Sequence, residues 1–188
     1  MSTTEPAPAS TPDTTPWLPL SVNARGIYLA AAIDPTNPCY NTAELLECPV
    51  GTNLDTLRQA LRHLYDENEG FRVRTRLHAG RAEQQVMGLD EFLENTEFLE
   101  NIELLPVPEN PHEEAPDSDP VPAMVRAWAS SLIAEPLNPD AGITVRSRVA
   151  FYADRLWVYH SFHHVVADGF AAFNGLSRIA SIYRALSS

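Results

Sequence analysis

Apolar residues recur at the three- and four-residue spacing of an amphipathic helix in four segments of this chain. The pattern predicts helices over residues 21–34, 53–70, 122–135 and 170–186. In the second segment, Asn53 suits a helix N-cap and precedes a stripe made of Leu54, Leu57, Leu61 and Leu64. In the last segment, the stripe expected to face inward consists of Phe173, Leu176, Ala180 and Tyr183.

Strands are predicted where β-prone residues stand between turn signals. They cover residues 40–48, 71–77, 81–87, 143–152 and 156–167, and a further strand is expected within residues 102–107. The second and third of these form a hairpin through Ala79-Gly80, and a tight turn joins the two long strands. Hairpins mixed with helices favour an α/β fold, a two-layer α/β sandwich with a mixed sheet, over a doubly wound parallel sheet.

Composition divides the chain into a leader and one globular domain. Residues 1–16 are almost entirely Ser, Thr, Ala and Pro and are expected to form a disordered leader. The chain is 44% apolar, so residues 17–188 have enough apolar side chains for one core. Residues 88–121 are acidic, and the proline-rich part from residue 106 is expected to be a solvated surface loop rather than a binding segment.

Charge and residue usage exclude several classes of function. A net charge of −12 argues against nucleic acid as a partner, because phosphate binding requires clustered basic residues. All 13 basic residues are arginine, so the chain has no lysine to form a Schiff base or to bind phosphate in a P-loop. The sequence shows neither a signal peptide nor an apolar run long enough to cross a membrane. We therefore expect a cytoplasmic protein with reduced cysteines and no membrane partner.

The candidate chemistry lies in residues 163–169, His-His-Val-Val-Ala-Asp-Gly, between the last predicted strand and the last predicted helix. An imidazole titrates near neutral pH and suits proton transfer from an attacking amine or hydroxyl, which points to acyl transfer. Strand alternation places His163 and His164 on opposite faces of the sheet, so only one of them projects into a given cavity. The same alternation argues against a metal site, because His160, His163 and His164 do not converge on a regular strand.

Taken alone, these residues leave two interpretations open. A lone histidine on an apolar strand is more often a core imidazole hydrogen-bonded to backbone than a catalytic group. Asp168 suits a helix cap and a functional acid at the positive end of a helix equally well. Gly169, which has no Cβ, suits a place where backbone passes close to another group.

Three segments resemble a known family, in the order in which that family carries them. Residues 163–169 resemble the HHxxxDG signature of the chloramphenicol-acetyltransferase-like superfamily. Residues 18–29 and 40–41 resemble the opening motif of nonribosomal peptide synthetase condensation domains, and residues 67–74 resemble their second motif, usually spelled RHExLRTxF. The chain is identified as similar to the N-terminal lobe of such a domain, with a chloramphenicol-acetyltransferase-like lobe as the fold that the resemblance implies.

The resemblance also implies a role for each residue of the site. In the catalytic histidine pair, His164 faces the reaction tunnel and His163 supports it. Asp168 is expected to form a structural ion pair with Arg72 of the second motif rather than to orient a histidine. Gly169 is expected to let the following helix start close to the site.

Two features set limits to the resemblance. In the second motif, Asn68 replaces the usual His and Thr75 replaces the usual Phe. Members of the family carry two lobes with the tunnel between them, and this chain resembles one. We therefore expect the 188 residues to fold but to have little or no condensation activity alone.

The implied reaction is amide-bond formation between an acyl thioester on a donor carrier protein and the amine of an aminoacyl thioester on an acceptor carrier protein. The implied partners are both carrier proteins and the C-terminal lobe of the same domain. Substrates would arrive on phosphopantetheine arms, with no tightly bound cofactor and no metal. Residues 159–183 also resemble siderophore synthetases whose first condensation domain accepts an aryl acid in trans, and if Met1 is the native start, the donor would come on a separate protein.

Two other functions fit the same motif. One is a stand-alone, trimeric, coenzyme A-dependent O-acetyltransferase that resembles chloramphenicol acetyltransferase, which is a single lobe of similar size. The other is a non-catalytic lobe that docks a carrier protein through its surface.

Overall fold

The computed structural model describes residues 15–96, 98–107 and 121–188, and its largest feature is a four-stranded sheet. In order across the sheet, the strands are β2 (Asn41–Glu47), β7 (Arg155–His163), β6 (Val145–Tyr152) and β5 (Phe98–Leu104). β5 runs parallel to β6, whereas the other neighbours are antiparallel. The mixed sheet expected from the sequence is therefore confirmed, and β5 begins earlier than predicted.

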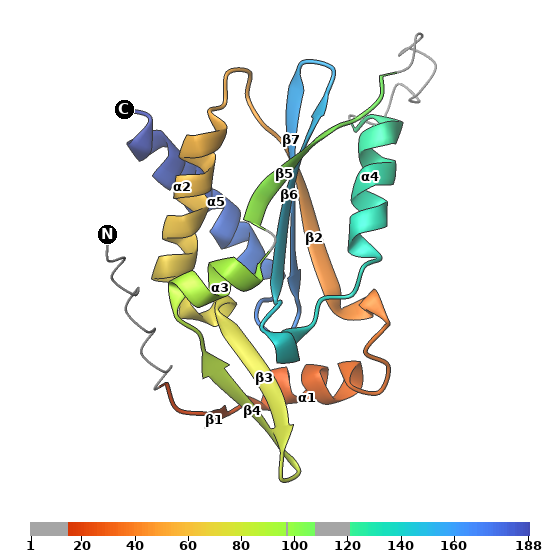
Figure 1. Cartoon of the computed structure of the whole chain (residues 1–188), viewed down its shortest axis with the longest axis vertical. Helices are drawn as coiled ribbons and strands as arrows, with labels where there is room; N and C mark the ends of the chain where they lie inside the picture. Colours follow the sequence, from red (N-terminus) through yellow and green to blue (C-terminus); the bar gives the residue numbers. More distant parts are fainter. Residues whose placement is uncertain (1–14, 97, 108–120) are drawn as a thin grey trace, which may run out of the picture.

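Helices cover both faces of this sheet (Figure 1). Helices α2 (Leu54–Glu67) and α5 (Gly169–Leu186) pack together on one face, and α4 (Ala123–Ile133) packs on the other. A short helix, α3 (Leu89–Asn95), which the sequence did not lead us to expect, packs Phe92 into the core under α2. The α/β sandwich is confirmed, with α4 as an additional helix on its second face.

A smaller sheet stands at one end of the molecule (Figure 1). Its strands, in order, are β1 (Leu18–Pro19), β4 (Arg81–Val86) and β3 (Val73–His78). The predicted hairpin turns at Ala79-Gly80, where both residues have positive φ, as a tight hairpin turn requires. Helix α1 (Val22–Ala31) begins at the N-cap Ser21 and packs beside β4.

Asparagine and aspartate caps start the two helices that lie nearest the motif. Asn53 accepts a hydrogen bond from Thr56 N at 2.9 Å at the start of α2, and the leucines at 57, 61 and 64 are buried behind it, as predicted. Asp168 accepts from Ala171 N at 2.8 Å at the start of α5. The two helices also meet through the Tyr183 hydroxyl, which accepts from Asn53 N at 2.7 Å.

The alternation predicted for β7 holds along its length. Leu156, Val158 and Phe162 join the core under α2 and α5. Trp157 and Tyr159 instead join the cluster under α4. Because the strand ends at His163 rather than at residue 167, alternation settles the direction of His163 but not that of the residues that follow it.

The inward face of α5 differs from the prediction. The buried residues are Ala172, Gly175, Ile179 and Ile182, while Leu176 and Tyr183 pack at the margin of the core. Phe173, predicted to face inward, is 66% exposed, and Ala180, also predicted to face inward, is exposed as well. The helix therefore turns a different face to the core from the one that the apolar stripe predicts.

The end of the expected leader is docked on the small sheet. The Thr15 hydroxyl donates to Val86 O at 2.8 Å, and the ring of Trp17 lies 3.9 Å from the guanidinium carbon of Arg76. Residues 15 and 16 of the expected leader thus lie against the small sheet, while residues 1–14 and most of the acidic loop lie outside the described residues, and the division into leader and domain stays a prediction. Across the described ranges, every helix is too short or too polar to cross a membrane.

Candidate active site

The motif occupies the connection between strand β7 and helix α5. His163 is the last strand residue, and its backbone N donates to Thr144 O at 2.8 Å. His164 N donates to Tyr40 O at 2.8 Å, so the chain stays tied to the neighbouring strand segment for one residue more. Residues 164–166 then form a turn that leads to the cap at Asp168.

His163 is buried and its ring is held by the turn that it begins. It is 5% exposed, and its Nδ1 accepts from Val165 N at 3.1 Å. Because Nδ1 is an acceptor, the proton of the neutral ring is assigned to Nε2. Burial, with the neighbouring His164 as a second cause, lowers the pKa of His163 to about 4. At neutral pH His163 is therefore an uncharged residue whose ring nitrogen holds the turn, and its supporting role in the reaction stays a prediction.

His164 is half-buried and keeps one ring nitrogen unused. Its Nδ1 is shielded from solvent and has no hydrogen-bond partner in the part of the chain that the structure describes. A shielded imidazole nitrogen without a partner is unfavourable unless another group completes its hydrogen bond. His164 is the less buried of the two histidines, and its role as the reacting residue stays a prediction.

Arg72 does not pair with Asp168, and that prediction is wrong. Its Nε donates to Tyr65 O at 2.9 Å and its Nη1 donates to Met87 O. Arg72 is 8% exposed, and its guanidinium connects the end of α2 with the end of β4. Backbone carbonyls accept from two of its nitrogens, and within the described residues no ion pair joins Arg72 to Asp168.

Asp168 and Gly169 have local roles in starting α5. The carboxylate of Asp168 is exposed and serves as the side-chain cap, which is one of the two interpretations left open by the sequence. A Cβ built on Gly169 would meet no atom within 4 Å. Packing within the described residues therefore does not require a glycine there, and the expectation that Gly169 brings the helix close to the site stays a prediction.

Both residues that depart from the second motif form side-chain hydrogen bonds. Asn68 donates through Nδ2 to Leu64 O at 2.8 Å and so closes the last turn of α2. Thr75 is buried, and its hydroxyl donates to Oδ1 of Asp140 at 2.6 Å. The same carboxylate accepts from the Tyr28 hydroxyl at 3.2 Å, so Thr75 helps to join the small sheet to α1.

An ion pair that the sequence did not predict links the second motif to α5. Glu67 and Arg178 form an ion pair, with Nη2 of Arg178 at 2.6 Å from Oε1 of Glu67. These residues are 111 positions apart, and both are exposed charges of ordinary type. No pattern in the sequence distinguishes them from other surface charges.

Comparison with known proteins identifies the family. A family model described as the condensation domain matches residues 16–188. The chain belongs to the condensation domain family. This condensation domain chain also has relatives among large synthetases. It is 31% identical over 166 residues to a dimodular nonribosomal peptide synthase of Bacillus subtilis, with 86% of the chain and 6% of that protein covered.

A second relative is an isonitrile lipopeptide synthase of Streptomyces coeruleorubidus. It is 28% identical over 190 residues, which cover 99% of the condensation domain chain and 12% of the synthase. The chain thus spans a small part of each of these relatives.

Solved structures confirm the fold. The starter condensation domain of the rhizomide synthetase matches with a TM-score of 0.72 and 20% identity, covering 92% of the chain and 38% of that structure. The first condensation domain of the calcium-dependent antibiotic synthetase matches with a TM-score of 0.72 and 24% identity, covering 89% of the chain and 37% of that structure. The expected chloramphenicol-acetyltransferase-like lobe is confirmed, and it corresponds to just over a third of each solved structure.

Proposed function

We propose that this chain supplies the histidine-bearing wall of a site that forms amide bonds in nonribosomal peptide synthesis. The observation that carries the proposal is His164, which stands half-exposed at the motif turn with a ring nitrogen unused, in a chain that belongs to the condensation domain family. The donor would be an acyl thioester and the acceptor an aminoacyl thioester. Each is held on the phosphopantetheine arm of a carrier protein, and neither requires a tightly bound cofactor or metal.

In the reaction, the amine nitrogen of the acceptor attacks the thioester carbonyl of the donor. The new carbon–nitrogen bond forms, the carbon–sulfur bond breaks, and the donor arm leaves as a thiol. His164 accepts the amine proton or orients the amine, and the proton ends on the departing sulfur. His163 acts as a positioning residue, because its Nδ1 holds the turn in which His164 lies.

The C-terminal lobe of a condensation domain is the partner expected to form the opposite wall. The described residues place one histidine turn at a surface and leave open space beside Gly169. Oxyanion donors for the tetrahedral intermediate would come from that lobe or from the substrate-bound state. This function places the chain in the cytoplasm, where carrier-bound substrates are made.

The decisive experiment uses loaded donor and acceptor carriers, with mass spectrometry of the acceptor as the readout. We expect amide product when the chain is joined to a C-terminal lobe, no product from His164→Ala, and little or none from the 188 residues alone. His78→Ala, which changes an exposed histidine in the hairpin, is the matched control and should keep full activity. Full activity in His164→Ala would disprove the role of His164, and His164-dependent turnover by the chain alone would disprove the need for a second lobe.

A further substitution distinguishes base catalysis from positioning. His164→Gln keeps a hydrogen-bonding side chain but cannot accept a proton near neutral pH. Residual activity without the wild-type pH dependence would indicate positioning, whereas complete loss with retained carrier binding would indicate a base.

The donor class is a finer part of the proposal. The resemblance of residues 159–183 to siderophore synthetases supports an aryl acid delivered in trans. One relative named as a lipopeptide synthase, and solved starter domains described in complex with C8-CoA, support a fatty acyl donor instead. Competition between aryl-loaded and octanoyl-loaded donor carriers would decide which is used, and preference for the octanoyl carrier would reject the siderophore assignment.

A further inference from the structure

A cavity of about 480 Å³ lies between α2 and α5, at the end of β7 away from the histidine turn. Its volume falls within the roughly 300–1,000 Å³ of small-molecule sites. Most of its wall is aliphatic and includes Leu46, Leu57, Val158, Leu176 and Ile179. It opens between the loop at residues 49–52 and the last turns of α5, where Ala180 and Arg184 are exposed.

Of the polar residues that line this cavity, only His160 is buried, and its imidazole is the polar group of the inner wall. The residue is 5% exposed, and its Nδ1 lies 2.9 Å from Oγ of Ser147, which in turn lies 3.3 Å from the Tyr65 hydroxyl. Within the described residues, Nε2 of His160 has no hydrogen-bond partner. A buried ring nitrogen in an apolar cavity is stabilised by any neutral group that completes its hydrogen bond.

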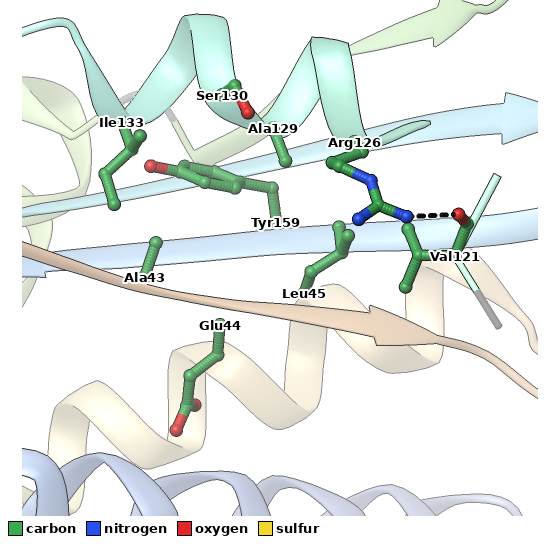
Figure 2. Close-up of a pocket in the computed structure, with 9 residues that line it drawn as sticks. All are labelled: Ala43, Glu44, Leu45, Val121, Arg126, Ala129, Ser130, Ile133 and Tyr159. Carbon is green, nitrogen blue, oxygen red and sulfur yellow. Dashed lines mark hydrogen bonds between the residues drawn. The ribbon is translucent and has the colours of Figure 1, made fainter. Parts of the chain in front are cut away.

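Charge beside the inner end of the cavity favours a neutral group. Glu44 does not line the cavity, but it is paired directly opposite His160 in the β2–β7 ladder, and its side chain points away from Tyr159, toward the layer of α2 and α5 (Figure 2). Oε2 of Glu44 is buried without a hydrogen-bond partner among the described residues, and burial raises the pKa of this carboxyl group. Burial also lowers the pKa of His160 to about 4, so the ring is neutral at pH 7. The cation among the lining residues, Arg184, is at the mouth, so an anionic group at the inner end would lie beside a neutral imidazole and near a carboxyl group.

We propose that this cavity binds a medium-length aliphatic chain that carries a hydroxyl group at its inner end, hydrogen-bonded to Nε2 of His160. A hydroxyl group fits because it can either donate or accept a hydrogen bond. It therefore suits Nε2 in whichever tautomer of His160 the contact with Ser147 selects. The site is separate from the histidine turn, since the fully buried Phe162 is the next residue along the same face of β7. It therefore does not depend on the amide-forming function.

The test is a titration of the 188-residue chain, labelled with nitrogen-15, with 1-octanol and with octanoate. We expect 1-octanol to give saturable shifts in the amide signals of residues 46–52 and 176–184, and to bind at least ten times more tightly than octanoate. Ala180→Phe should abolish binding by filling the mouth, because Ala180 lines it and is exposed. Ala185→Phe, the same change at an exposed position outside the lining, is the matched control.

Two further variants address the chemistry at the inner end. His160→Phe keeps an aromatic ring but removes the nitrogen, and should weaken 1-octanol binding roughly three- to tenfold, as expected for one lost hydrogen bond. Glu44→Gln should improve octanoate binding and leave 1-octanol binding unchanged.

Three results would overturn the proposal. These are no saturable shift with 1-octanol, undiminished binding in Ala180→Phe, and octanoate binding that equals or exceeds that of 1-octanol. Tight octanoate binding that is lost in Arg184→Ala would show a chain anchored by an anionic head at the mouth instead. None of these measurements uses condensation activity, so they are independent of the assay for the proposed function.

Discussion

Glu67 and Arg178 form a two-point ion pair that joins the end of α2 to the middle of α5. Arg178 donates through Nε to Oε2 of Glu67 at 2.8 Å and through Nη2 to Oε1 at 2.6 Å. The hydrogen bonds from Arg178 hold the pKa of Glu67 below its usual range. This pair, rather than the expected one between Arg72 and Asp168, connects the second motif to the helix that follows the histidine turn.

Removing the Glu67–Arg178 pair should have a small effect that depends on salt. Both side chains are about half exposed, so water and ions screen their attraction. We expect Arg178→Ala to lower the midpoint of thermal unfolding slightly in dilute buffer, with the difference from wild type shrinking in concentrated salt. Arg184→Ala is the control, since its guanidinium donates to the backbone carbonyl of Ala180. A large loss that is independent of salt would mean that Arg178 acts through packing instead.

Arg72 should matter far more to stability than any surface arginine. Its guanidinium is buried, and two backbone carbonyls accept from it. Replacement by Leu should cost about 2–4 kcal/mol in urea unfolding, because both carbonyls lose their partner in a buried place. Arg72→Lys should not restore stability, since an ammonium group cannot donate in two fixed directions as the guanidinium does. Wild-type stability in Arg72→Lys would contradict this assignment.

Asp168 provides the complementary test, because a cap and an ion pair respond differently to loss of charge. Asn caps helices as well as Asp does, so Asp168→Asn should unfold near the wild-type midpoint. Asp168→Ala, which removes the acceptor for Ala171 N, should cost about 1 kcal/mol. If Asp168→Asn proved as damaging as Arg72→Leu, the expected Arg72–Asp168 pair would form in solution after all.

The buried histidines should make the fold sensitive to mild acid. Burial lowers the pKa of both His160 and His163 to about 4, below their ordinary value of 6.5. Between pH 6.5 and 4 the unfolded chain binds protons that the folded chain does not, so stability falls as the pH falls through this range. Each histidine contributes up to about 3 kcal/mol to that loss. Urea unfolding at pH 7, 5.5 and 4.5 measures the effect.

The comparison variant for this experiment is His163→Gln, whose amide oxygen can still accept from Val165 N. It should lose less stability than wild type between pH 7 and pH 4.5. Carboxyl groups titrate in the same range in both proteins, and Glu44, whose pKa is raised, contributes in the opposite direction. The difference between the two proteins removes those contributions. Parallel pH curves would contradict this, because they would show that folding does not lower the pKa of His163.

The parts of the fold that the sequence predicts well depend on neighbours within a few positions. Asn53 caps α2, the turn at Ala79-Gly80 closes its hairpin, and β7 alternates between two cores, because caps, turns and strand periodicity are local properties. The motif likewise predicts that the two histidines differ, and the structure shows one buried and one half-buried.

The parts that it does not predict depend on distant segments. The donors of Arg72 are occupied by carbonyls of Tyr65 and Met87, which become available only when α2 and the end of β4 come together. The face of α5 was misjudged because Phe173 is large and apolar, yet it is 66% exposed, whereas the small Gly175 is buried beside Leu64 of α2. Tertiary packing overrides residue hydrophobicity in that case.

Replacing Gly175 with alanine should stabilise the chain. Gly175 lies within α5, and a Cβ built there would meet Leu64 Cδ2 at 3.9 Å and Phe71 Cζ at 4.0 Å, which are ordinary contacts. Gly175→Ala should therefore raise the free energy of unfolding by about 0.5–1 kcal/mol, because alanine loses less backbone entropy in a helix.

Two other glycines serve as controls for that substitution. They distinguish the effect of backbone strain from the effect of steric overlap with a new Cβ. Gly80 has a φ of 75° with nothing within 4 Å of a built Cβ, so Gly80→Ala should be destabilised only by backbone strain. Gly142 has a φ of 79° and its built Cβ lies 2.7 Å from Met87 Sδ, so Gly142→Ala should be the more destabilised of the two. Thermal unfolding of the three variants should rank Gly175→Ala above wild type, then Gly80→Ala, then Gly142→Ala. A destabilised Gly175→Ala would mean that α2 and α5 pack more tightly than these distances indicate.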